Sequence, residues 1–212
     1  MAEQEAVDLL IEGGIVVTMD AERCIYDQGY VAIDDGKISA VGAGSSGLAT
    51  TKRFDATGMI VLPGLVNAHN HLDQCVYRSC FDGPQVDDSL SFWHMALGLT
   101  RERARAAASL SLLDLAHYGV TTTQESHFTH YHPDSTDGVC DAIKDSRMRA
   151  VVGRGFSDGP KLPEPYRERT EAVIEDLNRL EETYDSELIT ICSEPSVSIR
   201  CTPEAIVAMY EW

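Results

Sequence analysis

Two histidines, His69 and His71, stand two positions apart at the end of the apolar run 60–69. On an extended strand, residues i and i+2 project to the same face, so both imidazole rings can reach one point. Neutral imidazole nitrogen is a ligand that zinc and similar borderline metals favour. The spacing therefore indicates a metal site, although the H-x-H pair alone is equally compatible with two surface histidines on a loop.

The segment that precedes this motif is predicted to be a small β module. Apolar or β-branched runs at 7–11, 15–19, 30–33 and 37–41 are separated by glycine-rich and aspartate-rich turn signals. The Asp35-Gly36 pair between two such runs is a strong hairpin signal. The run from Gly42 to Gly47 matches G-x-G-x-x-G, but no helix is predicted to open there, so we expect a plain loop rather than a dinucleotide site.

From residue 59 onward, strand-like runs alternate with helix-like stretches. Strands are expected at 60–69, 120–125, 149–153 and 188–193, and helices at 100–118, 139–146, 167–184 and from 203 onward. Gly119 is expected to end the first helix and Thr202 to cap the last one. Apolar strands that alternate with helices are typical of a parallel sheet, so four βα units are predicted.

The string around the two histidines, MIVLPGLVNAHNHLD at 59–73, resembles the first barrel strand of the amidohydrolase superfamily. The chain is most similar to the branch that contains cytosine, guanine and 8-oxoguanine deaminases and the s-triazine hydrolases. GVTTTQE at 119–125 resembles the second strand of that branch, and RAVVGRGF at 149–156 resembles the third.

This resemblance implies an α/β fold: a partial (β/α)8 TIM-type barrel, made of its first four βα units and preceded by a small β-sandwich module. Residues 1–58 would then be the N-terminal part of a composite β module, and residues 59–212 the first half of the barrel. A full barrel takes about 250 residues, so this chain of 212 residues is expected to hold about half of such an enzyme.

The resemblance also implies that His69 and His71 are ligands of one divalent metal, zinc in the first instance and iron as the alternative. In this mononuclear branch the other ligands and the acid–base residues follow later strands, so no catalytic residue is expected within the chain. Two-metal relatives carry a bridging lysine at the end of the fourth strand. Lys161 lies in a proline-rich loop, and the strand 188–193 has no lysine, so the mononuclear branch is favoured.

Five further residues are candidates for contacting the substrate: Gln74, Trp93, His127, Arg154 and Ser196. Gln74 and Ser196 lie where relatives place polar pocket residues, but a solvated loop amide and a turn cap are the alternatives. His127 and Arg154 stand near the ends of the second and third strands, at the rim of the barrel. A surface loop histidine and an ion pair with a neighbouring carboxylate are their alternatives, and Trp93 is either a pocket wall or a core anchor.

The composition restricts the partners. Asp and Glu number 34 against 17 Lys and Arg, which gives a formal net charge of −17 and argues against nucleic acid and anionic membranes as partners. Only four of the basic residues are lysines, so a salt-adapted surface is one interpretation and an ordinary acidic surface the other. The six cysteines form no C-x-x-C pair, the N-terminus is acidic, and no apolar run could span a bilayer, so a cytoplasmic protein is expected.

Two function hypotheses follow. In the first, the chain belongs to a metal-dependent hydrolase that deaminates or dechlorinates a cyclic amidine, such as a purine, pyrimidine, pterin or s-triazine, by means of a metal-activated water. In the second, it is a catalytically incompetent fragment that acts only with a complementary C-terminal half. Open sheet edges predict such a half, or a second copy of the chain, as a protein partner.

Overall fold

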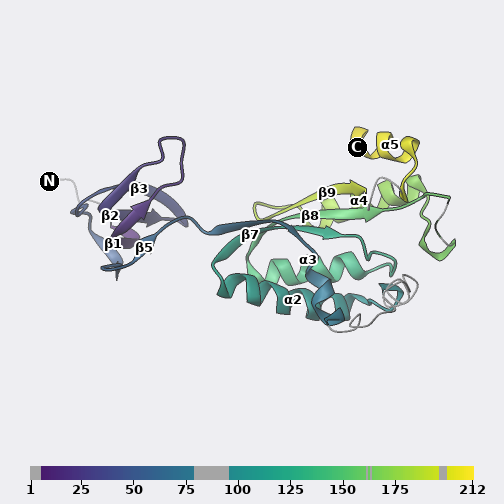
Figure 1. Cartoon of the computed structure of the whole chain (residues 1–212), viewed down its shortest axis with the longest axis horizontal. Helices are drawn as coiled ribbons and strands as arrows, with labels where there is room; N and C mark the ends of the chain where they lie inside the picture. The colour runs from purple at the N-terminus through teal and green to yellow at the C-terminus, as the bar shows by residue number, and fades with distance from the viewer. Residues whose placement is uncertain (1–5, 79–95, 161, 163, 196–199) are drawn as a thin grey trace, which may run out of the picture. The chain divides into compact units, whose positions relative to one another are not determined.

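The computed structural model describes residues 6–78, 96–160, 162, 164–195 and 200–212, and the chain divides into two compact units after Pro63. The first unit is a small β-sheet module, and the second is a parallel sheet with helices packed on it (Figure 1).

The first unit forms one five-stranded sheet. Its strands are β1 (Val7–Val17), β2 (Ile25–Asp34), β3 (Lys37–Ala43), β4 (Thr50–Asp55) and β5 (Ile60–Val61). β1, β2 and β3 pair antiparallel, whereas β4 and β5 both pair parallel to β1. The predicted hairpin is confirmed at Asp35 and Gly36, whose φ values of 47° and 71° give the turn the positive φ angles of a tight two-residue connection. The predicted β-sandwich stays a prediction.

One predicted break is wrong. Gly13 and Gly14 were expected to separate two strands, but β1 runs through them as one strand with two irregularities in its pairing to β2. Gly13 has a φ of 88°, which favours glycine, and a Cβ at Gly14 would lie 2.9 Å from the carbonyl oxygen of Ala56. The glycines therefore allow a bulge and a close approach while the ladder continues on both sides.

The strand expected at 60–69 is divided between the two units. Ile60 and Val61 form β5 and pair with β1, whereas Leu65–Asn70 form β6 of the second sheet. Pro63 and Gly64 lie between them. Proline has no N–H to donate to a ladder, and a Cβ at Gly64 would overlap the side chain of Thr121. The chain therefore passes from the first sheet to the second at Pro63 and Gly64. The predicted domain boundary between residues 58 and 59 stays a prediction.

The second unit is built from four parallel strands, each followed by a helix. The strand order is β6–β7–β8–β9, with β7 (Val120–His127), β8 (Arg149–Phe156) and β9 (Ile189–Pro195). The helices are α2 (Arg101–His117), α3 (Ser135–Ser146), α4 (Thr170–Tyr184) and α5 (Pro203–Glu211), with 3₁₀ turns at Leu72–Tyr77 and Glu164–Tyr166. The four predicted strand–helix pairs are thus present, and α2 and α3 lie side by side against the sheet (Figure 1).

Local signals explain where the helices begin and end. Thr100 and Thr202 accept hydrogen bonds from the third residue after each, as N-caps do. Gly119 lies between α2 and β7, and its φ of 77° lets the chain leave the helix. α3 begins at Ser135, earlier than the expected start at 139, because its polar first turn is held by tertiary contacts: both oxygens of Asp137 accept from Arg179 on α4.

The helices cover one face of the parallel sheet. Ala150, Val152 and Ile191 of that face belong to one apolar core with residues of all four helices, including Leu112, Ile143 and Leu177. The opposite face carries Val66 and Val151, which are 67% and 37% exposed. The two faces therefore differ sharply, and residues that alternate along a strand end either among the helices or on the uncovered face.

Candidate functional site

The carboxyl ends of the parallel strands bring polar side chains together on the uncovered face of the sheet. His69 and His71 come from the end of β6, with ring centroids 4.8 Å apart. Ser126 is the next-to-last residue of β7, and Glu194 is the next-to-last residue of β9. Parallel strands place their carboxyl ends at one edge, so residues far apart in the sequence meet there.

The orientation of the His71 ring is fixed by its neighbours. Its Nδ1 lies 2.6 Å from the carbonyl oxygen of Ser126, and Phe128 packs edge-on at a centroid distance of 4.9 Å. A carbonyl oxygen only accepts, so Nδ1 must carry the hydrogen and donate it. The lone pair of a neutral ring then stays on Nε2, which is the arrangement of a metal-ligating histidine.

Glu194 is a site residue that the sequence reasoning missed. The hydroxyl of Ser126 donates to its Oε1 at 2.7 Å, and its Oε2 is buried without a hydrogen-bond partner among the described residues. A Cβ at Gly153 would overlap Oε2, so the glycine makes room for the carboxylate. Its only sequence signal is a carboxylate directly after the predicted strand 188–193, where parallel strands place functional groups.

His127 lies on the other face. It is fully buried, and its Nδ1 lies 3.6 Å from Oδ1 of Asp73 and 3.5 Å from Oε1 of Glu125. The hydroxyl of Thr129 donates to Asp73 at 2.6 Å, and the backbone N–H of Leu72 donates to Glu125 at 2.6 Å. The structure contradicts both interpretations of His127, the substrate-facing one and the surface one. Alternation along β7 turns the ring toward the helices, where it is buried.

The charges of this buried cluster are strongly coupled. Burial raises the pKa of Glu125 to about 7, against the opposing effect of His127. Burial alone would lower the pKa of His127, but the carboxylates of Asp73 and Glu125 raise it to about 9. The pKa of Asp73 is lowered despite burial, because the neighbouring His127 ring and the hydrogen bond from Thr129 stabilise its charged form. Two carboxylates thus compete for one imidazole.

Arg154 also faces the helices rather than the uncovered face. Its guanidinium lies 2.8 Å from Oε1 of Glu168 and 3.0 Å from Oδ2 of Asp176, with 7% of its side chain exposed. His130 contacts the other oxygen of Glu168 at 2.6 Å. The structure therefore has the ion pair that was the alternative for Arg154, and the guanidinium is already used by two carboxylates.

Of the other predicted residues, only Gln74 is described. It is half-buried in the 3₁₀ turn after His71, and its backbone N–H donates to the carbonyl of His71 at 3.1 Å. Trp93, Lys161 and Ser196 lie outside the described residues. Their predicted roles stay predictions.

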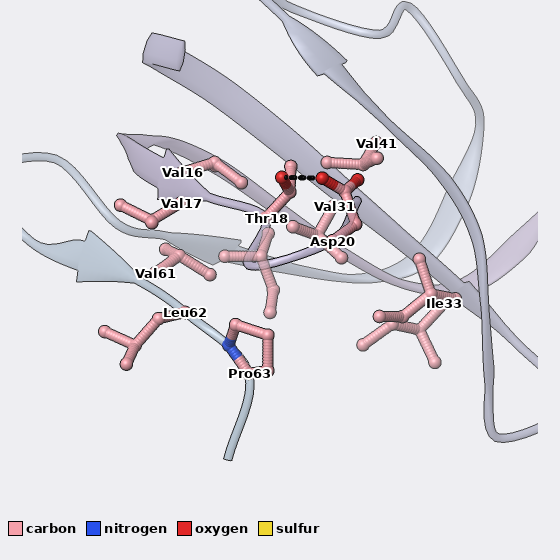
Figure 2. A pocket seen from close by; sticks show the side chains of 12 residues that line it. Val16, Val17, Thr18, Asp20, Val31, Ile33, Val41, Val61, Leu62 and Pro63 are labelled. Atoms are coloured by element: carbon pink, nitrogen blue, oxygen red, sulfur yellow. Dashed lines mark hydrogen bonds between the residues drawn. The ribbon is translucent and has the colours of Figure 1, made fainter. Parts of the chain in front are cut away.

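A separate concave surface lies in the first unit (Figure 2). This cleft of about 340 Å³ is lined mainly by aliphatic side chains, and its polar lining residues are Thr18 and Asp20. The hydroxyl of Thr18 donates to Asp20 at 2.6 Å, as the dashed line in Figure 2 shows. The lining offers no imidazole or thiol, so hydrolytic chemistry is better placed at the strand ends. Among the described residues, no helix is both long and apolar enough to cross a membrane.

Comparison with known proteins places the fold and the motif in context. Residues 60–211 match the family model described as Amidohydrolase family. The 5-methylthioadenosine/S-adenosylhomocysteine deaminase of Symbiobacterium thermophilum is 29% identical over 207 residues, which cover 96% of this chain and 46% of that protein. The 5'-deoxyadenosine deaminase of Methanosarcina mazei is 31% identical over 151 residues, which cover 70% of this chain and 33% of that protein.

A solved structure shares the fold over the same span. The atrazine chlorohydrolase of Arthrobacter aurescens TC1, complexed with zinc, has a TM-score of 0.79 and 25% identity, and the match covers 96% of this chain and 50% of that chain. This chain thus spans about half the length, or less, of the proteins that it matches.

Proposed function

This chain belongs to the amidohydrolase family, and on that premise we propose that it binds a divalent metal through His69 and His71 and serves the hydrolysis of a ring substrate. The reaction is the removal of an exocyclic amino group from a cyclic amidine. We propose this activity for the complete protein that contains these residues.

The fixed ring of His71 carries the proposal. Its Nδ1–H is used by the Ser126 carbonyl, which leaves Nε2 as the atom that can bind a cation on the uncovered face. His69 lies beside it at the end of the same strand. Two imidazoles fit a zinc-type ion in ligand chemistry but fall short of the three or more protein ligands that catalytic zinc normally has. The additional length of the relatives is sufficient to supply the rest.

A divalent metal bound there would acidify a water molecule and so supply the nucleophile for hydrolysis at neutral pH. The chain's own residues orient this centre. The Ser126 carbonyl holds the His71 ring, and the Ser126 hydroxyl holds the Glu194 carboxylate over Gly153. Since no described residue hydrogen-bonds to its Oε2, Glu194 can accept an N–H or O–H from a substrate at the same edge.

We favour a 5'-substituted adenosine as the substrate. Support comes from the relatives that align over most of this chain, which are named as deaminases of 5-methylthioadenosine, S-adenosylhomocysteine and 5'-deoxyadenosine. An s-triazine is the second candidate, because the atrazine chlorohydrolase shares the fold over 96% of the chain. Both are electron-poor nitrogen rings that a hydroxide can attack at carbon, with ammonia or chloride as the leaving group.

The test is ammonia release by the complete gene product with zinc and each of the three nucleosides, and chloride release from atrazine. We expect turnover of at least one nucleoside, with kcat/KM reduced at least about 100-fold by His71→Ala. His117→Ala, which removes an exposed histidine from α2, serves as the matched control. Failure to turn over any of these rings, or full activity of His71→Ala, contradicts the proposal.

A further inference from the structure

Three buried polar side chains converge on the helix-facing side of the second sheet. We propose that Asp73, Glu125 and His127 bind a divalent metal ion as a buried structural centre, distinct from the His69 and His71 pair on the uncovered face. The proposal is independent of the substrate, and it stands on the geometry, the hydrogen bonding and the charge of the three side chains.

The ligand atoms converge at distances that suit a metal. One atom from each side chain lies within 4.8 Å of the other two. Nδ1 of His127 is 3.5 Å from Oε1 of Glu125 and 3.6 Å from Oδ1 of Asp73. These distances exceed the usual ~2.7–3.2 Å of a hydrogen bond. They are close to ~3.4 Å, the edge of a tetrahedron whose ligands lie ~2.1 Å from zinc.

Two of the three converging atoms have no hydrogen-bond partner in the part of the chain that the structure describes. They are Oε1 of Glu125 and Nδ1 of His127, and both side chains are 0% exposed. A buried polar atom without a partner is costly, and a charged one more so. Because the two atoms face one another, a single cation between them would satisfy both.

The other atoms of the cluster are already engaged in ways that turn the free ones inward. Oδ2 of Asp73 accepts from Thr129, and Oε2 of Glu125 accepts from the backbone N–H of Leu72. Nε2 of His127 lies 3.2 Å from the hydroxyl of Ser135, which donates to the carbonyl of Thr129 at 3.4 Å. Because the Ser135 hydroxyl proton is donated to the Thr129 carbonyl, Nε2 of His127 must donate to Ser135. In the neutral form of the ring, the lone pair is then on Nδ1. Ligands of metal sites are oriented by outer contacts of this kind.

Charge balance points the same way. A metal ion bound at Nδ1 of His127 would displace the proton that the ring otherwise carries between the two carboxylates. The cluster would then offer the ion two carboxylates and a neutral imidazole in a fully buried position. A divalent cation neutralises both. One imidazole and two carboxylates suit zinc, manganese or ferrous iron better than calcium or magnesium. Because the site is closed, the ion would be taken up as the chain folds.

The experiment uses the 212-residue chain with His69→Ala and His71→Ala, which removes the histidine pair on the uncovered face. After refolding with zinc or manganese and extensive dialysis, we expect about one ion per chain by elemental analysis. Adding Glu125→Gln should raise the dissociation constant of that ion at least about 100-fold, because it removes a charged ligand. His130→Gln is the matched control, since it removes an equally buried histidine of the same segment and should leave the ion in place.

Absence of a retained ion in the His69→Ala and His71→Ala chain overturns the proposal, because a proton then fills the space between the carboxylates and the ring. Equal retention after Glu125→Gln does so as well. Should Glu125→Gln fail to fold, the cobalt-loaded parent decides. Visible ligand-field absorption that Asp73→Asn alters supports the site, and a spectrum of free cobalt excludes it.

Discussion

His69 and His71 belong to one motif, but their surroundings prepare them differently. The His71 ring has one nitrogen engaged by a carbonyl and an aromatic neighbour at its edge, whereas the His69 side chain is exposed. A pre-oriented ligand loses less freedom on binding than a mobile one. His71 should therefore contribute more to metal affinity than His69.

We predict that His71→Ala weakens zinc binding on the uncovered face more than His69→Ala does. The affinity for zinc should fall about 10- to 100-fold or more in His71→Ala. Isothermal titration calorimetry of the folded, dialysed chain measures it, with His117→Ala as a control that leaves affinity unchanged. Equal affinity in all three variants contradicts the assignment of both ligands.

Arg154 shows how burial turns an ion pair into a structural requirement. Its guanidinium is held between Glu168 and Asp176 with little exposure, whereas Arg105 and Asp145 form a pair whose side chains are 54% and 57% exposed. Removing one partner of a buried pair leaves a charge without compensation, but an exposed pair contributes little.

Arg154→Met should therefore lower the free energy of unfolding by about 3–5 kcal/mol. Arg105→Met should change it by less than about 1 kcal/mol. Urea titrations followed by circular dichroism compare the two. Similar losses in both variants would show that burial of the Arg154 pair has no special weight.

At the scale of elements, the alternation of strands and helices was predictable because it depends on local patterns. Thr202 and Gly119 marked a helix start and a helix end in the sequence, and both act so in the structure. β4 was not predicted, because its residues (TTKRFD) are polar and mostly exposed, and their extended form depends on parallel pairing with β1. Long-range pairing of this kind leaves no local pattern.

The site residues likewise differ in whether a local pattern marks them in the sequence. H-x-H is a local motif and was found at once, whereas Glu194 meets Ser126 across 68 positions and Glu125 meets Leu72 across 53. For His127 and Arg154, the choice between the two faces of the sheet depended on the strand register. A shift of one residue in that register exchanges the faces, and the sequence did not determine it.

The stability of the second unit should depend on pH through Glu168, which contacts His130 and Arg154. Burial alone would raise the pKa of this carboxyl, but His130 and Arg154 lower it from 4.5 to about 2. A carboxyl whose pKa is lower in the folded state stabilises the fold above its unfolded pKa. That contribution is lost as the pH falls from about 4.5 to about 2.

We expect Glu168 to account for a loss of about 3 kcal/mol of unfolding free energy across this range. Urea titrations at a series of pH values measure the loss, and Glu168→Gln should flatten that part of the profile. Glu164→Gln, at a carboxyl that is 93% exposed, is the matched control and should leave it intact. An unchanged slope in Glu168→Gln argues against the lowered pKa.

For the whole molecule, the dominant electrostatic fact is a net charge of −17, with 34 acidic residues against 17 basic ones. Buried pairs such as Arg154 with Glu168 are shielded from salt, but exposed carboxylates repel one another through water. Raising the salt from 0.1 M to 1 M shortens the screening length from about 10 Å to about 3 Å. Repulsion between exposed carboxylates should then fall more than the few exposed ion pairs lose.

We therefore predict that the melting temperature rises in molar potassium chloride, by about 2–4 °C for each kcal/mol of repulsion removed. A variant with Glu175→Lys and Glu182→Lys, two exposed positions on α4, should melt higher in dilute buffer and respond less to salt. Ala172→Gln, an exposed neutral change on the same helix, controls for substitution there. Identical melting in dilute and molar salt would mean that the acidic surface carries no destabilising repulsion, and it would remove the case for salt adaptation.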